Sequence, residues 1–185
     1  MQRLPGGGAA PGGGPGGLAT PPSGAFRYYK DDGKTRGAYT SDGKNYTFGD
    51  MGYLDEEGWL YLSDRRSDLI ISGGANIYPA EVDAVLLAHP KIADACTVGI
   101  PNEEWGEEVL SAVELRPGFP PSEALAEEIR AFCREHLAKF KCPRMIEFRD
   151  HLPRTDAGKL LRRTLREEVR ARATSAGGSN GSASR

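Results

Sequence analysis

The stretch Asp64-Arg-Arg-Ser-Asp-Leu-Ile-Ile-Ser-Gly-Gly-Ala-Asn-Ile-Tyr-Pro-Ala-Glu81 decides the fold of this chain. It opens with a cluster of charges, and the apolar run Leu69-Ile70-Ile71 then predicts a buried strand. Ser72-Gly73-Gly74 follows as a turn with little side-chain bulk, in which the backbone can reach positive φ. Pro79 is typical of the first residue of a helix. The pattern therefore predicts a strand-turn-helix unit whose bare backbone closely approaches a thin partner.

Composition divides the 185 residues into four segments. Residues 1–25 are rich in Gly and Pro and residues 171–185 in Ser, Gly and Ala, so neither end has enough apolar surface to offset the entropy of ordering it. We expect both ends to be disordered. Between them, residues 26–66 and 67–170 have apolar side chains for one modest core or two small ones.

Charge and cysteine content exclude several classes of function. The formal net charge of −2 indicates neither nucleic acid nor an anionic membrane as a partner. Cys96, Cys133 and Cys142 lack disulfide or metal-site spacing, so we expect reduced core thiols and no metal site. No apolar run is long enough for a signal peptide or a membrane span. These features together predict a cytoplasmic protein.

A β-hairpin is predicted just before the opening stretch. Residues 51–54 and 59–62 are apolar-aromatic runs that flank the turn Asp55-Glu56-Glu57-Gly58. Asp50 follows Phe48-Gly49 at the mouth of this hairpin. Taken alone, Asp50 is more simply a solvated turn acid.

The remainder alternates strands and helices. We expect an amphipathic helix over 80–89, a helix over 122–138 capped by Ser122, and strands at 92–100, 109–115 and 145–148. A basic helix places Leu161, Leu165 and Val169 on one face, and its arginines are expected to form its solvated face. This order predicts an α+β domain, with a three-stranded sheet flanked by helices and preceded by the β-hairpin.

Four motifs in this order resemble the C-terminal end of AMP-forming acyl-CoA synthetases, in the adenylate-forming superfamily that also holds luciferases and peptide-synthetase adenylation domains. The resemblance covers Phe26 to about Val169. The motifs are Phe48-Gly49-Asp50 with its hairpin, Asp64-Arg65 through Glu81, Pro101 to Glu107, and Pro153-Arg154-Thr155-Asp156-Ala157-Gly158-Lys159.

The resemblance implies a role for each of several residues. Asp50 would accept hydrogen bonds from the ribose of ATP, and Arg65 would help hold the same ribose or a phosphate. Ser67 would be the hinge between the large and small domains. Lys159 would place its charge between the substrate carboxylate and the α-phosphate, an electrostatic contribution of roughly 3–4 kcal/mol.

The turn Ser72-Gly73-Gly74 would line the channel for the pantetheine arm of CoA, and the small domain would rotate between the two half-reactions. ATP and CoA are therefore the expected substrates. Mg²⁺ would be held mainly by the large N-terminal domain.

Three departures from the family pattern affect these roles. Phe48 stands where Thr is common, which removes a hydroxyl from that position, although Thr47 is adjacent. Ser67 stands where Asp or Lys is usual. The phosphate loop and the acyl and adenine pockets belong to the large domain, and no matching residues occur in this sequence.

The implied reaction is carboxylate plus ATP plus CoA to acyl-CoA, AMP and pyrophosphate, of the fatty-acid type that the Ser-Gly-Gly-x-Asn-Ile-Tyr-Pro pattern resembles. We expect the chain alone to be inactive or nearly so, because the ATP- and acyl-binding N-terminal domain is missing. Two alternatives stay open. The chain is a non-catalytic standalone or truncated domain that docks on a separate adenylating subunit, or its full-length form passes the acyl group to a carrier protein.

Overall fold

The computed structural model describes residues 16–19, 26–57 and 59–177. The chain separates into two compact units, Met1–Ser67 and Asp68–Arg185, and each is described by itself. The boundary falls immediately after Ser67. No helix in the described part of the chain is long and apolar enough to cross a membrane.

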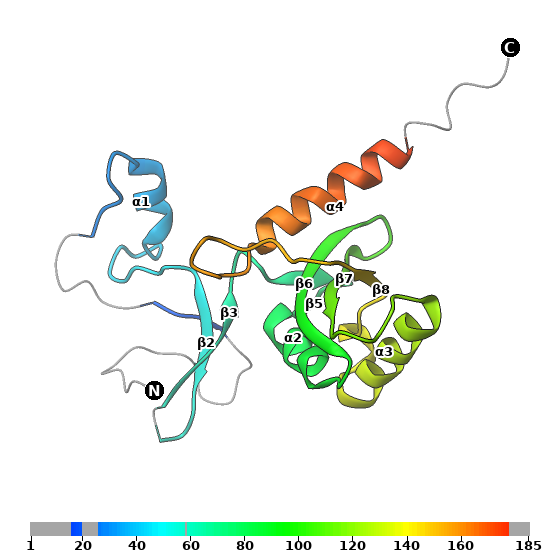
Figure 1. The fold of residues 1–185 in the computed structure, drawn as a ribbon. Helices are drawn as coiled ribbons and strands as arrows, with labels where there is room; N and C mark the ends of the chain where they lie inside the picture. The colour runs from blue at the N-terminus through cyan, green and yellow to red at the C-terminus, as the bar shows by residue number, and fades with distance from the viewer. Residues whose placement is uncertain (1–15, 20–25, 58, 178–185) are drawn as a thin grey trace, which may run out of the picture. The chain divides into compact units, whose positions relative to one another are not determined.

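The first unit is built on a three-stranded antiparallel sheet in the order β1-β2-β3 (Figure 1). β1 is Gly16–Gly17, β2 is Asp50–Leu54 and β3 is Leu60–Arg65. The predicted hairpin is confirmed by β2 and β3, and the Asp55 carboxylate accepts the backbone N–H groups of Glu57 and Trp59 in its turn.

Two features of this unit were not expected from the sequence. The helix α1, Asp32–Ala38, is capped by the Asp31 side chain, which accepts the N–H of Lys34. Within the segment expected to be disordered, Gly16–Gly17 pairs with β2. The expectation of disorder was also wrong for residues 171–177, which continue a helix that begins at Arg162. Residues 1–15, 20–25 and 178–185 lie outside the described residues.

Aromatic side chains form the apolar cluster of the first unit. The rings of Phe26 and Tyr46 stack with their centroids 4.7 Å apart, and Phe48 meets both rings edge-on at 5.2 Å. Tyr28 and Tyr39 contact the same cluster. Such stacked and edge-on pairs add stabilisation beyond the area that they bury. Phe48 therefore has a packing role in this chain.

The second unit is α+β, with a five-stranded mixed sheet. Its elements are β4 Ile70–Ser72, β5 Ala75–Ile77, α2 Pro79–Ala88, β6 Ile92–Asn102, β7 Gly106–Leu115, α3 Glu123–His136, the 3₁₀ turn Lys139–Lys141, β8 Met145–Phe148 and α4 Arg162–Gly177. The strands run in the order β5-β4-β7-β6, and β8 pairs parallel with β7.

The sheet differs from the expected three-stranded one. β4 joins it through the pairing of Ser72 with Gly106, and the three-residue strand β5 was not predicted. Gly73-Gly74 consequently connects two strands rather than a strand and a helix. The helix begins one strand later, and Pro79 is its first residue as predicted.

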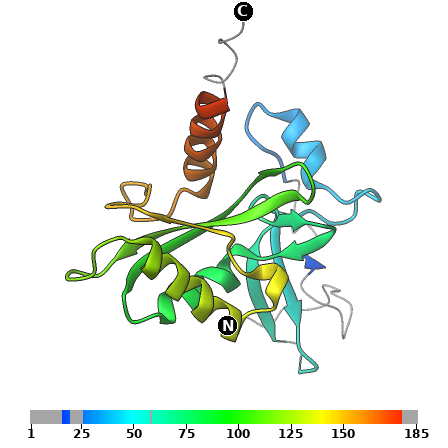
Figure 2. The same ribbon diagram turned by 90° about the vertical axis from the view of Figure 1, so that its right-hand side faces the viewer.

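Helices pack on both faces of this sheet: in Figure 2, α2 and α3 lie along one side, and α4 projects from the other. Because successive residues of a strand point to opposite faces, β6 and β7 contribute to two separate cores. On one face, α2 and α3 pack their apolar side chains on Ala95, Val109 and Val113. On the other, Leu165 and Val169 of α4 pack on Cys96, Val98 and Leu110. The N-terminus of α3 is capped as predicted, since the Ser122 hydroxyl accepts the N–H of Leu125 at 3.2 Å.

Truncation of Leu165 should test the packing of α4. The side chain is fully buried, so Leu165→Ala should lower the free energy of unfolding by about 2–5 kcal/mol. Leu87→Ala is the matched control, because Leu87 of α2 is 45% exposed and should lose much less. Urea denaturation of the two variants measures the difference. Equal losses would mean that α4 does not pack on the sheet.

Candidate functional site

Asp50 and Arg65 face each other across the hairpin of the first unit. They are partners in the register of β2 and β3, and Arg65 Nε lies 3.6 Å from Asp50 Oδ1. The side chains are 42% and 59% exposed, so both remain open to a ligand. The Arg66 N–H donates to the carbonyl of Gly49 at 2.7 Å and closes the ladder beside them. The hairpin thus pairs a carboxylate with a guanidinium at its open end.

Thr47 lies next to this pair. Its hydroxyl oxygen accepts the N–H of Gly49 at 2.9 Å, which leaves the hydroxyl proton available to another acceptor. Gly49 has a φ of 84°, a conformation that favours glycine. Thr47 therefore presents a hydroxyl one residue from the position at which Phe48 lacks one.

The glycine turn lies at the tip of the β4–β5 hairpin. Ser72 pairs with Ala75, so Gly73 and Gly74 form a two-residue loop, and their φ values of 56° and 80° are those of a type I′ turn. Both glycines are exposed. The turn is a bare backbone projection, as the sequence predicted, although it joins different elements.

Trp105 lies against this turn and was not assigned a role from the sequence. Its carbonyl accepts the N–H of Gly73 at 2.8 Å, and a Cβ added to Gly73 would lie 2.8 Å from the indole Cε3. The Arg144 guanidinium lies 5.3 Å from the ring centroid. The motif Pro101 to Glu107 was singled out in the sequence, but only the fold brings its tryptophan to the turn.

The segment from Pro101 to Glu107 is also hydrogen-bonded to β4. The Glu107 carboxylate accepts the N–H of Ile71 at 3.0 Å, and a Cβ on Gly99 would meet that carboxylate at 2.9 Å. The Asn102 side chain accepts the N–H groups of Glu104 and Trp105, each at 3.0 Å. These contacts fix the position of the indole.

Lys159 lies on a short closed loop before α4. Gly158 N–H donates to the carbonyl of Thr155 at 2.8 Å, and Thr155 N–H donates to the carbonyl of Lys159 at 2.9 Å. The Thr155 hydroxyl also accepts the Lys159 N–H at 3.1 Å. At the base, Arg154 and Leu160 form an isolated antiparallel bridge. The motif therefore builds a hydrogen-bonded turn that ends at the lysine.

The Lys159 side chain is exposed. Among residues 16–19, 26–57 and 59–177, no carboxylate forms an ion pair with its ammonium group. An exposed cation on an ordered backbone can meet an incoming anion without first breaking an internal pair.

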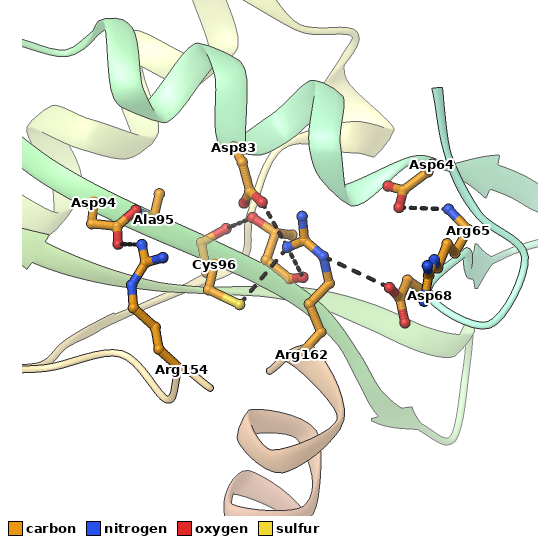
Figure 3. Close-up of polar contacts among 11 residues, drawn as sticks. Asp64, Arg65, Asp68, Asp83, Asp94, Ala95, Cys96, Arg154 and Arg162 are labelled. Atoms are coloured by element: carbon orange, nitrogen blue, oxygen red, sulfur yellow. Dashed lines mark hydrogen bonds and ion pairs between the residues drawn. The ribbon is translucent and has the colours of Figure 1, made fainter. Parts of the chain in front are cut away.

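A largely buried arginine, Arg162, follows the loop, and for this residue the expectation that the arginines of α4 form its solvated face was wrong. Arg162, the first residue of α4, donates to the Asp83 carboxylate of α2 at 2.6 Å and to the carbonyl of Thr97 at 3.3 Å (Figure 3). Its Nε lies 4.0 Å from the Asp68 carboxylate. Burial raises the pKa of the Asp83 carboxyl, and the charge of Arg162 partly opposes that shift. No periodicity in the sequence signals this contact.

The three cysteines belong to the cores of the second unit or pack against them. All three are free thiols, as expected; Cys96 and Cys133 are buried, and burial raises the pKa of each of these two to about 11. Within the described ranges there is no cluster of three or more His, Cys, Asp or Glu side chains that could hold a metal ion.

Comparison with known proteins agrees with these features. Residues 81–159 match the family described as AMP-binding enzyme C-terminal domain. Residues 81–159 are therefore similar to the C-terminal domain of AMP-binding enzymes.

Curated proteins similar to this chain include several named 2-succinylbenzoate–CoA ligase. The 2-succinylbenzoate–CoA ligase of Geobacillus kaustophilus (strain HTA426) is 58% identical over 121 residues, which are 65% of this chain and 24% of that protein. The chain thus spans about a quarter of the length of the curated relatives that it matches.

Solved structures give the same family. The o-succinylbenzoate CoA synthetase (MenE) of Bacillus subtilis, in complex with the acyl-adenylate intermediate OSB-AMP, has a TM-score of 0.73 and 40% identity, covering 85% of this chain and 31% of that one. The ATP-bound RpMatB-BxBclM chimera B1 has a TM-score of 0.77 and 37% identity, covering 84% and 31%. The roles assigned to Asp50, Arg65, Ser67, Ser72, Gly73, Gly74 and Lys159 stay predictions.

Substitution of the two turn glycines should separate backbone strain from contact with Trp105. Alanine at positive φ costs about 1–2 kcal/mol, which both Gly73→Ala and Gly74→Ala should show. Gly73→Ala should cost more, because its Cβ would also meet the indole, whereas Gly74 faces open space. Thermal or urea unfolding measures both. In a Trp105→Ala background the two costs should become equal, and a persistent difference would show that the indole is not its cause.

Proposed function

We propose that this chain is the C-terminal part of a 2-succinylbenzoate–CoA ligase, which joins that carboxylate to CoA with conversion of ATP to AMP and pyrophosphate. The identity of 58% to a ligase with this name supports this substrate in place of the fatty acid expected from the sequence. The observation that carries the chemistry is the exposed Lys159 ammonium, which has no ion-pair partner in the described chain, on a loop closed by its own hydrogen bonds.

In the first half-reaction, a carboxylate oxygen attacks the α-phosphorus of ATP and pyrophosphate leaves. Attacker and target are both anionic, so the barrier falls if a cation sits between them. Lysine suits this task as a compact charge on a flexible stem. In this proposal, Lys159 supplies the cation and the Asp50 carboxylate accepts the ribose hydroxyls. Arg65 lies beside Asp50 and adds a donor for the same nucleotide.

In the second half-reaction, the CoA thiol attacks the acyl-adenylate carbonyl and AMP leaves. A thin pantetheine arm needs a channel with little side-chain bulk, and the Gly73-Gly74 turn is a bare backbone beside Trp105. Rotation of the small domain about Ser67 would move Lys159 away from the reacting groups and bring the Gly73-Gly74 turn to them. Within this proposal, CoA rather than a carrier protein is the acceptor, because the relatives are named for CoA.

Lys159→Ala should separate the two half-reactions. For this test the chain is joined to the large domain of the Bacillus subtilis o-succinylbenzoate CoA synthetase. Adenylation is measured as the release of pyrophosphate. We expect the rate of adenylation to fall by about 10²–10³-fold, which is the loss seen when one electrostatic donor is removed from an active site. Thioester formation from preformed acyl-adenylate and CoA should stay within about twofold. Equal loss in both steps would refute the role of Lys159, and a holo-carrier protein that outcompetes CoA would refute the acceptor.

A second pair of chimeras should test the class of ligase. Because the small domain and the large domain must fit each other, this chain should restore activity to the large domain of a 2-succinylbenzoate ligase better than to that of a fatty acyl ligase. We expect at least about a tenfold advantage in kcat/KM, relative to each parent enzyme. The chain by itself should release no AMP above the blank. A preference for the fatty acyl partner would reject the proposed substrate.

A further inference from the structure

Arg154 ties the backbone next to Lys159 to the edge of the sheet. Arg154 Nη2 donates to the Asp94 carboxylate of β6 (Figure 3), and Arg154 Nη1 donates to the carbonyl of Gly158. Gly158 directly precedes Lys159. A single side chain therefore joins β6 to the residue before the lysine.

The geometry of this bridge requires arginine. A guanidinium presents several N–H donors in a rigid fork, so that it can hold two oxygens at once in fixed directions. A lysine could keep the ion pair with Asp94, but a single ammonium on a flexible stem does not fix two acceptors in this way. Arg154 can therefore fix the position of Gly158 relative to β6 as well as neutralise Asp94.

Gly158, whose carbonyl Arg154 contacts, also closes the Lys159 loop. Gly158 has a φ of 80°, and its N–H closes the turn on the carbonyl of Thr155. At the far end, Arg162 fixes the start of α4 to Asp83 and to the Thr97 carbonyl. Arg154 and Arg162 thus anchor the two ends of the Lys159 loop to β6 and α2, and the ammonium group stays free of both aspartates.

From this arrangement we propose that Arg154 is a positioning residue for Lys159. It acts through the Gly158 carbonyl and through Asp94, and it contacts no substrate. The inference rests on the proposed function, because it assumes that Lys159 serves adenylation. Its consequence is specific to one half-reaction. Loss of the bridge should impair adenylation and leave thioester formation at the glycine turn intact.

Arg154 is a better test position than Arg162. Arg162 and Asp83 are largely buried, and removal of either partner leaves an uncompensated charge inside the protein, which costs about 3–5 kcal/mol and can prevent folding. The Arg154 and Asp94 side chains are 39% and 20% exposed, so Arg154→Lys should fold. The matched control is Arg163→Lys, because the Arg163 side chain is 88% exposed and pairs with Glu167 on the surface of α4.

The first experiment measures order in the loop of the full chain, without any catalysis. In ¹⁵N relaxation and amide exchange, Arg154→Lys should lower the heteronuclear NOE of Gly158 and Lys159 and speed exchange at both amides by about tenfold or more. Arg163→Lys should change neither amide. Unaltered order at Gly158 and Lys159 in Arg154→Lys would overturn the proposal.

The second experiment measures both half-reactions in the chimera with the Bacillus subtilis large domain. Arg154→Lys should slow adenylation about 10- to 100-fold, the penalty for a displacement of about 1 Å, and thioester formation from preformed acyl-adenylate should stay within twofold. Equal loss in both steps would indicate a structural role only and would overturn the proposal. If the unsubstituted chimera forms no adenylate, the proposed function fails, and loop order still decides whether Arg154 positions the lysine.

Discussion

The antiparallel ladder between β6 and β7 is the constraint on which the second unit depends. It runs from the pairing of Ile92 with Leu115 to that of Asn102 with Gly106, and both of its faces are covered by helices. A ladder buried on both sides admits few polar side chains. The hydroxyls of Thr97 and Ser111, paired across it at 2.7 Å, satisfy each other. In the described sheet β6 pairs with β7 alone, and Arg162 donates to a carbonyl on its free side.

Stability and chemistry occupy different parts of this unit. The buried side chains lie along the ladder and under α2, α3 and α4. The groups to which we assign chemistry, Lys159 and the turn Gly73-Gly74, lie on exposed connections outside both cores. Each connection is nevertheless ordered from within the unit, one by Arg154 and the other by Trp105. An exposed group on a fixed backbone binds a partner with little loss of conformational entropy.

Local sequence signals predicted the elements that local forces determine. The hairpin of β2 and β3 follows from Asp55 in its turn, and α3 follows from Ser122 as its cap. β5 was missed, because three residues without an aromatic or a β-branched run form a strand only when β4 is there to pair with them. Two adjacent glycines are also typical of a hairpin turn, which is the structure that Gly73 and Gly74 form here.

The candidate site residues could be named from the sequence, but the residues that support them could not. Asp50, Arg65 and Lys159 stand in short motifs that a sequence shows directly. Arg154, Arg162 and Trp105 act on partners that are distant along the chain, and only the fold creates those contacts. A basic helix with acidic interruptions is usually solvated, so nothing in the pattern distinguished Arg162 from its neighbours.

The buried thiols have a consequence for the behaviour of this unit under oxidising conditions. With a pKa of about 11, Cys96 and Cys133 are ionised in only about one molecule in ten thousand at pH 7, and the thiolate is the form that peroxides and alkylating reagents attack. These two side chains therefore resist modification while the fold is intact. Rapid labelling of either would report that the core had opened.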